Sequence, residues 1–262
     1  MSSYSISKET TYWAVRLLAL LIISQCFQAV TLSMVSEAGD IGHGHTSTFI
    51  SISKISLGEY VRSDYIESIE RTYSPVYASS TMSQGPDSLR IKCDRDGVLL
   101  QTIFSFHEGG PEIKIAKDGA ISVVTGAGEK VNNICVHSSG KNTIIFGYSD
   151  FKPHTYQYVD DMESYLREHI FSGTYKDENG RIYRFTSDGN AYFPSNTFTY
   201  YVGFDHTFYK FDWFNDETNR KLYSFERSGD RLKIYETHGE PDGPGPIKVD
   251  SVPVLDLIKQ NE

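Results

Sequence analysis

The spacing of turn signals constrains the fold of this 262-residue chain more than any other feature. From residue 89 onward, short runs of alternating apolar and polar residues are separated by tight-turn pairs such as Asp96-Gly97, Asp118-Gly119 and Asp188-Gly189. Alternation with a period of two is typical of strands with one buried face, and Asp-Gly pairs between such runs are strong hairpin signals. Evenly spaced hairpins favour an antiparallel β-barrel or sandwich over a parallel sheet with crossover helices. The sequence therefore predicts a mainly β fold.

Two short helices are predicted within the β pattern. The first begins at Ser63, a residue type that caps helices, and ends before Pro75. The second begins at Asp160 or Asp161, with Glu163 in capping-box position behind Asp160.

The N-terminal residues 1–26 are typical of a secretory signal, with a basic start, a short apolar centre and small residues at the end. Two alternatives stay open: an uncleaved membrane anchor, and lipidation of Cys26 at a site that resembles a bacterial lipoprotein signal. Residues 27–54 are rich in Ser, Thr and Gly, and we expect them to form a flexible leader. The protein is therefore predicted to be exported, as a periplasmic, secreted or membrane-anchored protein.

The remaining chain is predicted to hold two similar β units, residues 55–160 and residues 161–262. Each contains a Gly-x-Tyr strand close to one of the helices, Gly58-Glu59-Tyr60 in the first and Gly173-Thr174-Tyr175 in the second. Whether the two units form two barrels or one is left open by the sequence.

Cys93 and Cys135 are the cysteines that follow the N-terminal segment. In an exported chain, two cysteines favour one disulfide. A bridge that closes a loop of this length would stabilise the fold by about 4 kcal/mol in the chain-entropy model. The alternative is a pair of unbonded, buried thiols.

Several function classes are disfavoured by the composition and the motifs. The formal net charge is −9, whereas a nucleic-acid surface or a charge-bound anionic membrane needs clustered Lys and Arg. His43 and His45 supply too few ligands for a metal site, and His107-Glu108 is read as a polar pair beside a turn. No nucleophile elbow, phosphate loop or dinucleotide motif is found. We therefore expect a protein that is not an enzyme, with no cofactor and no metal.

The second half resembles the lipocalin-like (calycin) β-barrel proteins. The residues behind the resemblance are Gly173-Thr174-Tyr175 after a helix, then Ile182-Tyr183-Arg184-Phe185 and Asp188-Gly189. In that family the opening motif is Gly-x-Trp, so Tyr175 stands where the family has Trp. The resemblance implies a barrel with an internal cavity that holds a small apolar ligand.

Aromatic residues are concentrated in the same half, since 17 of the 35 aromatic residues lie between Phe171 and Phe225. Tyrosine and tryptophan, with an apolar body and a polar tip, suit a ligand pocket or a recognition surface. We expect the cavity to be lined by Tyr201, Tyr209, Trp213 and Tyr223. The alternative is that these aromatic residues only form the hydrophobic core and cross-strand pairs of the sheet.

The sequence thus predicts an exported, non-enzymatic β-barrel protein that binds a small apolar ligand. The alternative function is a cell-envelope interaction or inhibitor protein that acts through its surface.

Overall fold

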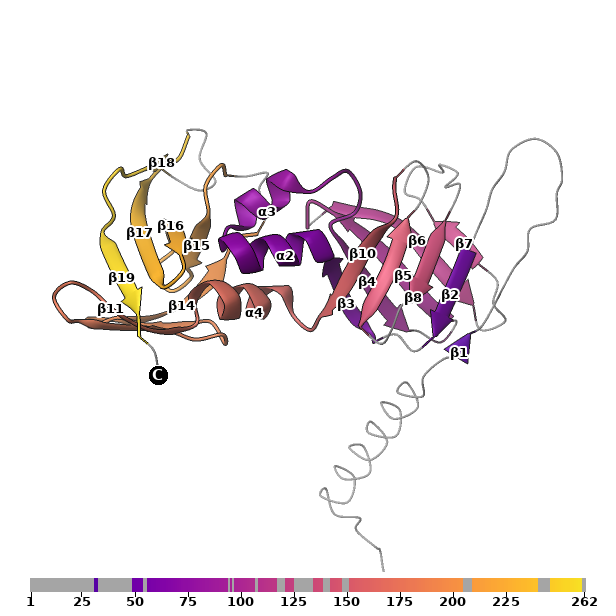
Figure 1. Ribbon diagram of the computed structural model, residues 1–262, viewed down its shortest axis with the longest axis horizontal. Helices are drawn as coiled ribbons and strands as arrows, with labels where there is room; N and C mark the ends of the chain where they lie inside the picture. The colour runs from indigo at the N-terminus through magenta and orange to yellow at the C-terminus, as the bar shows by residue number, and fades with distance from the viewer. Residues whose placement is uncertain are drawn as a thin grey trace, which may run out of the picture.

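The computed structural model describes residues 31–32, 49–53, 56–93, 95, 97–106, 108–116, 121–124, 134–138, 142–147, 151–204, 209–239 and 246–260. Two β-sheets with helices between them make up this part of the chain (Figure 1). The prediction of a mainly β protein with an antiparallel barrel is confirmed.

The first sheet has ten strands and is curled (Figure 1). Its strands are β1 (Thr31–Leu32), β2 (Phe49–Ser53), β3 (Gly58–Arg62), β4 (Ser88–Cys93), β5 (Gly97–Phe104), β6 (Glu108–Ala116), β7 (Ile121–Val124), β8 (Cys135–Ser138), β9 (Thr143–Gly147) and β10 (His154–Val159). They lie in the order β1-β2-β8-β9-β10-β3-β4-β5-β6-β7, and the pairing of β2 with β8 is parallel. Strands β1 and β2 fall within the range that the sequence predicted as a leader.

The second sheet closes into a barrel of eight antiparallel strands. Its strands are β11 (Gly173–Lys176), β12 (Ile182–Phe185), β13 (Asn190–Tyr192), β14 (Thr197–Val202), β15 (Trp213–Asp216), β16 (Lys221–Ser228), β17 (Arg231–His238) and β19 (Leu255–Lys259), with β18 (Lys248–Val249) as a ninth strand beside β17. From β11 to β17 each strand pairs with the next one along the chain, and β19 pairs with both β17 and β11. The chain therefore forms an up-and-down barrel, as its regularly spaced turn signals predict.

Three α-helices lie between the two sheets (Figure 1). They are α2 (Ser63–Thr72), α3 (Pro75–Thr81) and α4 (Met162–Leu166), and α4 continues into one π-helical turn, η1 (Arg167–Phe171). In the part of the chain that the structure describes, no helix combines the length and the apolar composition needed to span a membrane.

The helix boundaries correct two sequence predictions and show one further helix. Helix α2 begins at Ser63, so that residue is not the cap. Helix α2 ends before Pro75, as predicted, and Pro75 occupies the first turn of the further helix α3, where its missing N–H group and fixed φ are tolerated. The cap of α4 is Asp161, whose carboxylate accepts a hydrogen bond from the Ser164 N–H group at 2.8 Å. Glu163 does not complete a capping box and instead pairs with Arg167.

The helices share one apolar core with the barrel. Tyr65, Ile66 and Ile69 on α2 are at most 4% exposed and belong to the same cluster as the buried side chains inside the barrel. A separate apolar cluster lies within the curled sheet, around Tyr60 and Tyr156. The helices therefore cover one end of the barrel, which is called the helix end below.

The predicted disulfide is absent from the structure. Cys93 is exposed, Cys135 is half-buried, and the two are not bonded. Their strands β4 and β8 are separated in the sheet by β3, β10 and β9. Four strand spacings amount to roughly 19 Å along the sheet, whereas a disulfide needs Cα atoms within about 7 Å. This prediction was wrong because the spacing of cysteines in the sequence does not reveal the order of the strands.

Candidate functional site

Aromatic rings fill the helix end of the barrel. Phe171, the last residue of η1, lies at the centre of four rings, with centroid distances of 5.3 Å to Phe185, 5.6 Å to Tyr200, 5.2 Å to Phe214 and 4.8 Å to Phe225. All five side chains are at most 2% exposed. These tilted and edge-to-face contacts are the arrangements that aromatic rings prefer. The rings occupy the space that an internal ligand would need at this end.

Arg227 closes the same end from β16. Its guanidinium donates hydrogen bonds to the backbone carbonyls of His169 and Ile170 at the end of η1, and to the Tyr175 hydroxyl at 3.4 Å. It also lies 4.4 Å from the ring centroid of Tyr73. Burial raises the pKa of Tyr175 to about 12, so its hydroxyl remains protonated at neutral pH. Arg227 therefore ties the helical segment to the barrel wall.

The strand register places two of the predicted cavity residues outside the barrel. Val202 pairs with Phe214, and both side chains are fully buried in the core. Successive side chains of a strand point to opposite faces, so the neighbouring residues Tyr201 and Trp213 point outward. Tyr209, on the segment before β15, contacts Trp213 on this outer side. Tyr201, Tyr209 and Trp213 thus do not line the interior.

The three residues nevertheless lie together, and Phe211 joins them. The ring centroids are 5.8 Å apart for Tyr201 and Trp213, 5.3 Å for Tyr209 and Trp213, and 5.3 Å for Tyr209 and Phe211. All four side chains are half-buried, so each has a contact face and a solvent face. We call Tyr201, Tyr209, Phe211 and Trp213 the outer aromatic patch.

Trp213 is held rigidly within the patch. Its indole lies directly on Gly203, where an added Cβ would be 2.0 Å from the Trp213 Cε2 atom. The Gly203 N–H group donates to the Trp213 carbonyl at 3.0 Å, which keeps the two backbones together. The indole Nε1 atom is buried and has no hydrogen-bond partner among the described residues. A side chain larger than glycine at residue 203 would displace the indole.

Asp212 fastens the underside of the patch to α3. Its Oδ1 atom accepts a hydrogen bond from the Val76 N–H group at 2.8 Å, and its carbonyl accepts one from the Phe225 N–H group at 3.0 Å. Burial raises the pKa of the Asp212 carboxyl, against hydrogen bonds from Ser74 and Val76 that lower it. The segment 209–212 is thereby positioned by both the barrel and a helix.

The patch also connects to the curled sheet through aromatic contacts. Phe204 lies 6.0 Å from Tyr201 and 5.4 Å from Phe106, between ring centroids. Phe106 stands in the turn between β5 and β6, and its ring is 4.8 Å from that of Tyr65 on α2. A continuous series of ring contacts therefore runs from the patch to the core beneath the helices.

Tyr223 is the one predicted cavity residue on the inner face, because it pairs directly with the buried Phe214. It lies toward the far end of the barrel, away from the helices. Its ring stacks on Phe214 at 5.1 Å with an interplanar angle of 16°. Lys221 Nζ lies 5.1 Å from its ring centroid and 2.5 Å from Glu236 Oε1. A polar rim therefore borders a half-buried tyrosine at this end.

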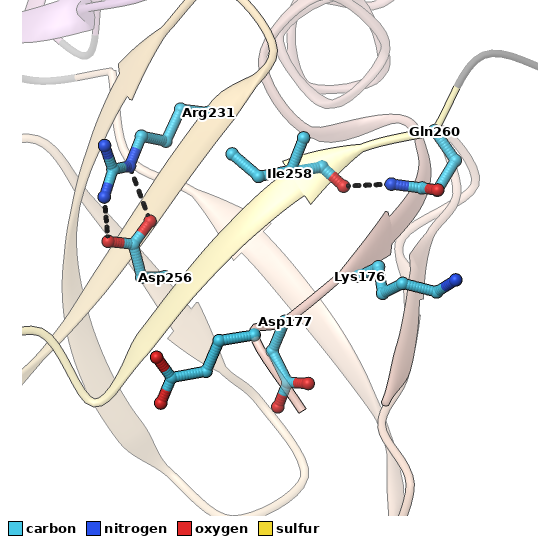
Figure 2. Close-up of a pocket in the computed structure, with 7 residues that line it drawn as sticks. Lys176, Asp177, Arg231, Asp256, Ile258 and Gln260 are labelled. Carbon is cyan, nitrogen blue, oxygen red and sulfur yellow. Dashed lines mark hydrogen bonds and ion pairs between the residues drawn. The ribbon is translucent and has the colours of Figure 1, made fainter. Parts of the chain in front are cut away.

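An open cleft of about 350 Å³ lies outside the barrel, where β11 and β19 separate (Figure 2). It is lined by Lys176, Asp177, Glu178, Arg231, Asp256, Ile258 and Gln260. Arg231 binds Asp256 through two hydrogen bonds, of 2.7 Å from Nε and 2.5 Å from Nη2. Asp177 is held by its own turn, where it accepts from Arg181 Nε at 2.6 Å. The cleft is thus a charged surface around the exposed Ile258 side chain, with two basic and three acidic lining residues.

Four other positions that the sequence singled out lie outside the described residues: Cys26, His43, His45 and His107. Where the structure describes the chain, no group of three or more His, Cys, Asp or Glu side chains is placed to hold a metal ion.

No family model, no curated protein and no solved structure matches the chain.

Proposed function

We propose that this chain is an exported, non-enzymatic protein that binds another protein through the outer aromatic patch, with the closed barrel as a rigid support. One observation carries the proposal. Tyr201, Tyr209 and Trp213 gather on the outer surface, whereas Phe171 and four further rings fill the helix end of the interior.

The chemistry of the patch fits protein recognition. Trp and Tyr are the residue types that most often dominate protein interfaces, because they bury a large apolar area and keep a polar tip. The attachment of Trp213 to Gly203 and of Asp212 to α3 fixes the patch before binding. A patch ordered in advance loses less conformational entropy when its partner arrives.

Export is supported by the sequence of residues 1–26, with its basic start and short apolar centre. The partner would accordingly be a protein of the cell envelope or of the extracellular space.

Site-specific photocrosslinking in the producing cell tests the proposal. A photoreactive phenylalanine analogue replaces Lys210, which is exposed between Tyr209 and Phe211. The matched control carries the analogue at Leu57, which is 42% exposed and lies just before β3 of the curled sheet. We expect an adduct of one discrete mass from position 210 and none from position 57.

Two further variants separate binding from folding. Tyr209→Ala should abolish the adduct at position 210 without a change in far-UV circular dichroism, because Tyr209 lies outside the core cluster. Trp213→Ala should strongly reduce the yield of the adduct and lower the melting temperature only slightly. If the adduct survives both substitutions, or if position 57 gives the same adduct, the patch is not the binding surface.

A second candidate function is the binding of a small apolar ligand at the far end of the barrel. The observation that favours it is the half-buried Tyr223 on the inner face, stacked on Phe214. Native mass spectrometry with organic extraction of the protein from its host distinguishes the two candidates. A stoichiometric apolar molecule that is lost in Tyr223→Ala and retained in Tyr209→Ala supports the carrier function, and a clean apoprotein mass excludes it.

A further inference from the structure

Asn179 is the one asparagine in the sequence that is followed by glycine. Asn179 and Gly180 are both exposed in the turn that joins β11 to β12. The backbone of Gly180 has a φ angle of 79°, and no atom beyond its chain neighbours lies within 4 Å of the position that a Cβ atom would take. Because glycine has no side chain, the Gly180 nitrogen is not shielded from the side chain that precedes it.

The side-chain amide of Asn179 is free to turn toward this nitrogen. The backbone N–H group of Asn179 donates to Asp177 Oδ1 at 3.0 Å, whereas its amide makes no hydrogen bond to the described residues. Asn219 is the contrasting case, because its Nδ2 atom donates to Asp216 Oδ2 at 2.7 Å. Asparagine is one of the thermolabile residue types of proteins. An unbonded, solvated amide beside an unshielded glycine nitrogen is the arrangement that permits a reaction between them.

We propose that Asn179 deamidates spontaneously in the folded protein by reaction with Gly180. The Gly180 nitrogen loses its proton to hydroxide and attacks the Cγ atom of Asn179. The new N–Cγ bond closes a succinimide ring, the Cγ–Nδ2 bond breaks, and ammonia leaves with a proton taken from water. Water then opens the ring at either carbonyl, which gives aspartate or isoaspartate at residue 179. Water is the only co-reactant, and no atom changes its oxidation state.

Asp177 sets the rate of this reaction, because it holds the turn in which the reaction occurs. Its carbonyl accepts a hydrogen bond from the Gly180 N–H group at 3.0 Å, which opposes the loss of that proton. Its carboxylate accepts from the N–H groups of Asn179 and Arg181 at 3.0 Å and 2.8 Å. Arg181 Nε and the Tyr183 hydroxyl donate to the same carboxylate at 2.6 Å and 3.2 Å. These bonds restrain the backbone rotation that ring closure requires, so Asp177 is a positioning residue that slows the reaction.

Two other turns lack one of the features that make Asn179 reactive. Asn196 is exposed before β14, but the branched side chain of Thr197 shields the nitrogen that would attack. Asp188 is followed by a glycine, but Gly189 is buried, and the Asp188 carboxylate accepts a hydrogen bond from the Thr186 hydroxyl. An ionised carboxylate is also a weaker electrophile than an amide. The turn between β11 and β12 therefore combines the required features.

The products change the charge and the length of the turn. Either one adds a negative charge next to Asp177 and Glu178, at the edge of the cleft that Figure 2 shows. Isoaspartate also lengthens the main chain by one carbon atom between residues 179 and 180. The N–H groups of Gly180 and Arg181 then no longer match their acceptors on Asp177, so the turn loosens.

The modification goes beyond the proposed function and does not depend on it. In the barrel, β13 and β14 lie between β12 and β15, and β15 carries Trp213. The outer aromatic patch is therefore not altered by a change in the turn between β11 and β12.

Peptide mapping by mass spectrometry of the freshly purified full-length protein, incubated at neutral and at mildly alkaline pH, tests the proposal. We expect aspartate and isoaspartate to accumulate at residue 179 in proportion to the hydroxide concentration, while Asn196 and Asn219 keep their amides. Electron-transfer fragmentation distinguishes the two products. Asn179→Gln should prevent the reaction at this position, because its longer side chain would have to close a larger ring.

Variants at residue 177 test the positioning role. Asp177→Ala should accelerate the reaction in the folded protein by about two- to tenfold, the factor that corresponds to one typical hydrogen bond. Asp177→Asn keeps an acceptor for the Asn179 and Arg181 N–H groups and should react more nearly at the wild-type rate. In concentrated urea all three proteins should react equally fast, because the turn is lost. Circular dichroism checks that both variants fold, as expected for a residue outside the core cluster.

Two results would overturn the proposal. The first is a folded wild-type protein in which Asn179 keeps its amide entirely through an incubation that converts it in urea. The second is conversion of Asn196 or Asn219 before Asn179. Equal rates for wild type and Asp177→Ala in the folded state would overturn the role of Asp177.

Discussion

Replacing Phe171 by alanine should open a cavity in a barrel that is now filled at its helix end. The side chain is fully buried and touches four other rings. Truncation of a buried phenylalanine costs about 3–5 kcal/mol, through lost transfer free energy and through the cavity that remains. Four ring contacts place Phe171→Ala toward the upper part of that range. For a chain of this size, about 2–4 °C per kcal/mol corresponds to a fall in melting temperature of roughly 6–20 °C.

The same substitution should create a binding site. The rings around Phe171 are apolar apart from the Tyr200 hydroxyl, which already donates to the Thr186 carbonyl at 2.9 Å. A cavity of this kind stays dry and accepts small aromatic molecules. Phe171→Ala should therefore bind benzene or a similar probe and regain melting temperature as the probe concentration rises. The wild-type protein should show no such shift, because Phe171 already occupies the space.

Urea unfolding, with and without benzene, measures both effects. Phe171→Leu keeps much of the volume and should lose less stability, with a weaker response to benzene. Tyr192→Ala removes a side chain that is 44% exposed and should change stability by no more than about 0.5 kcal/mol. If Phe171→Ala costs less than about 1.5 kcal/mol, or if benzene stabilises the wild type as much as the variant, the interior is not filled in the way described.

Three other predictions follow from the contacts. Arg227→Met leaves the carbonyls at the end of η1 without their donor and should lower the free energy of unfolding by about 1–3 kcal/mol; no change in urea unfolding would contradict this role. Burial raises the pKa of Asp212 in the folded protein, so its stabilising contribution is present at low pH and is lost as pH rises through the folded pKa. Asp212→Asn keeps an acceptor for Val76 and should therefore be more stable than wild type at about pH 8 and similar to it near pH 3, in paired urea titrations. Because no disulfide joins Cys93 and Cys135, a thiol reagent should label Cys93 quickly without prior reduction, and Cys135 slowly, since burial raises the pKa of the Cys135 thiol.

Local turn chemistry explains why the barrel could be predicted from the sequence. Asp188-Gly189 and Gly229-Asp230 lie at turns between neighbouring strands, and both glycines have positive φ angles, 88° and 57°. Each signal acts over a few residues, so neither a distant contact nor an alignment is needed to read it. Joined in order, such hairpins form an up-and-down sheet.

The binding residues were harder to predict, because alternation tells which side chains share a face and not which face is inside. Tyr200 and Tyr201 are both aromatic, yet Tyr200 is buried in the barrel and Tyr201 lies outside. A shift of one residue exchanges the two faces of a strand, and aromatic residues on both faces remove the usual contrast with polar neighbours. The position of Phe171 inside the barrel depends on tertiary packing, for which the sequence near the end of a helix gives no local signal.

At the helix end of the barrel, the predicted boundary between two units near residue 160 does not separate two hydrophobic cores. Tyr65 and Ile69 come from the first half of the chain, yet they belong to the same core as Leu232 and Leu257 of the barrel. Opening this end to a ligand would require the displacement of Phe171 and the exposure of the buried face of α2. Because aromatic contacts also link α2 through Phe106 and Phe204 to Tyr201, such a movement would disturb the outer patch. A closed interior and an ordered outer surface therefore depend on the same packing, and this supports the proposed recognition on the outer surface.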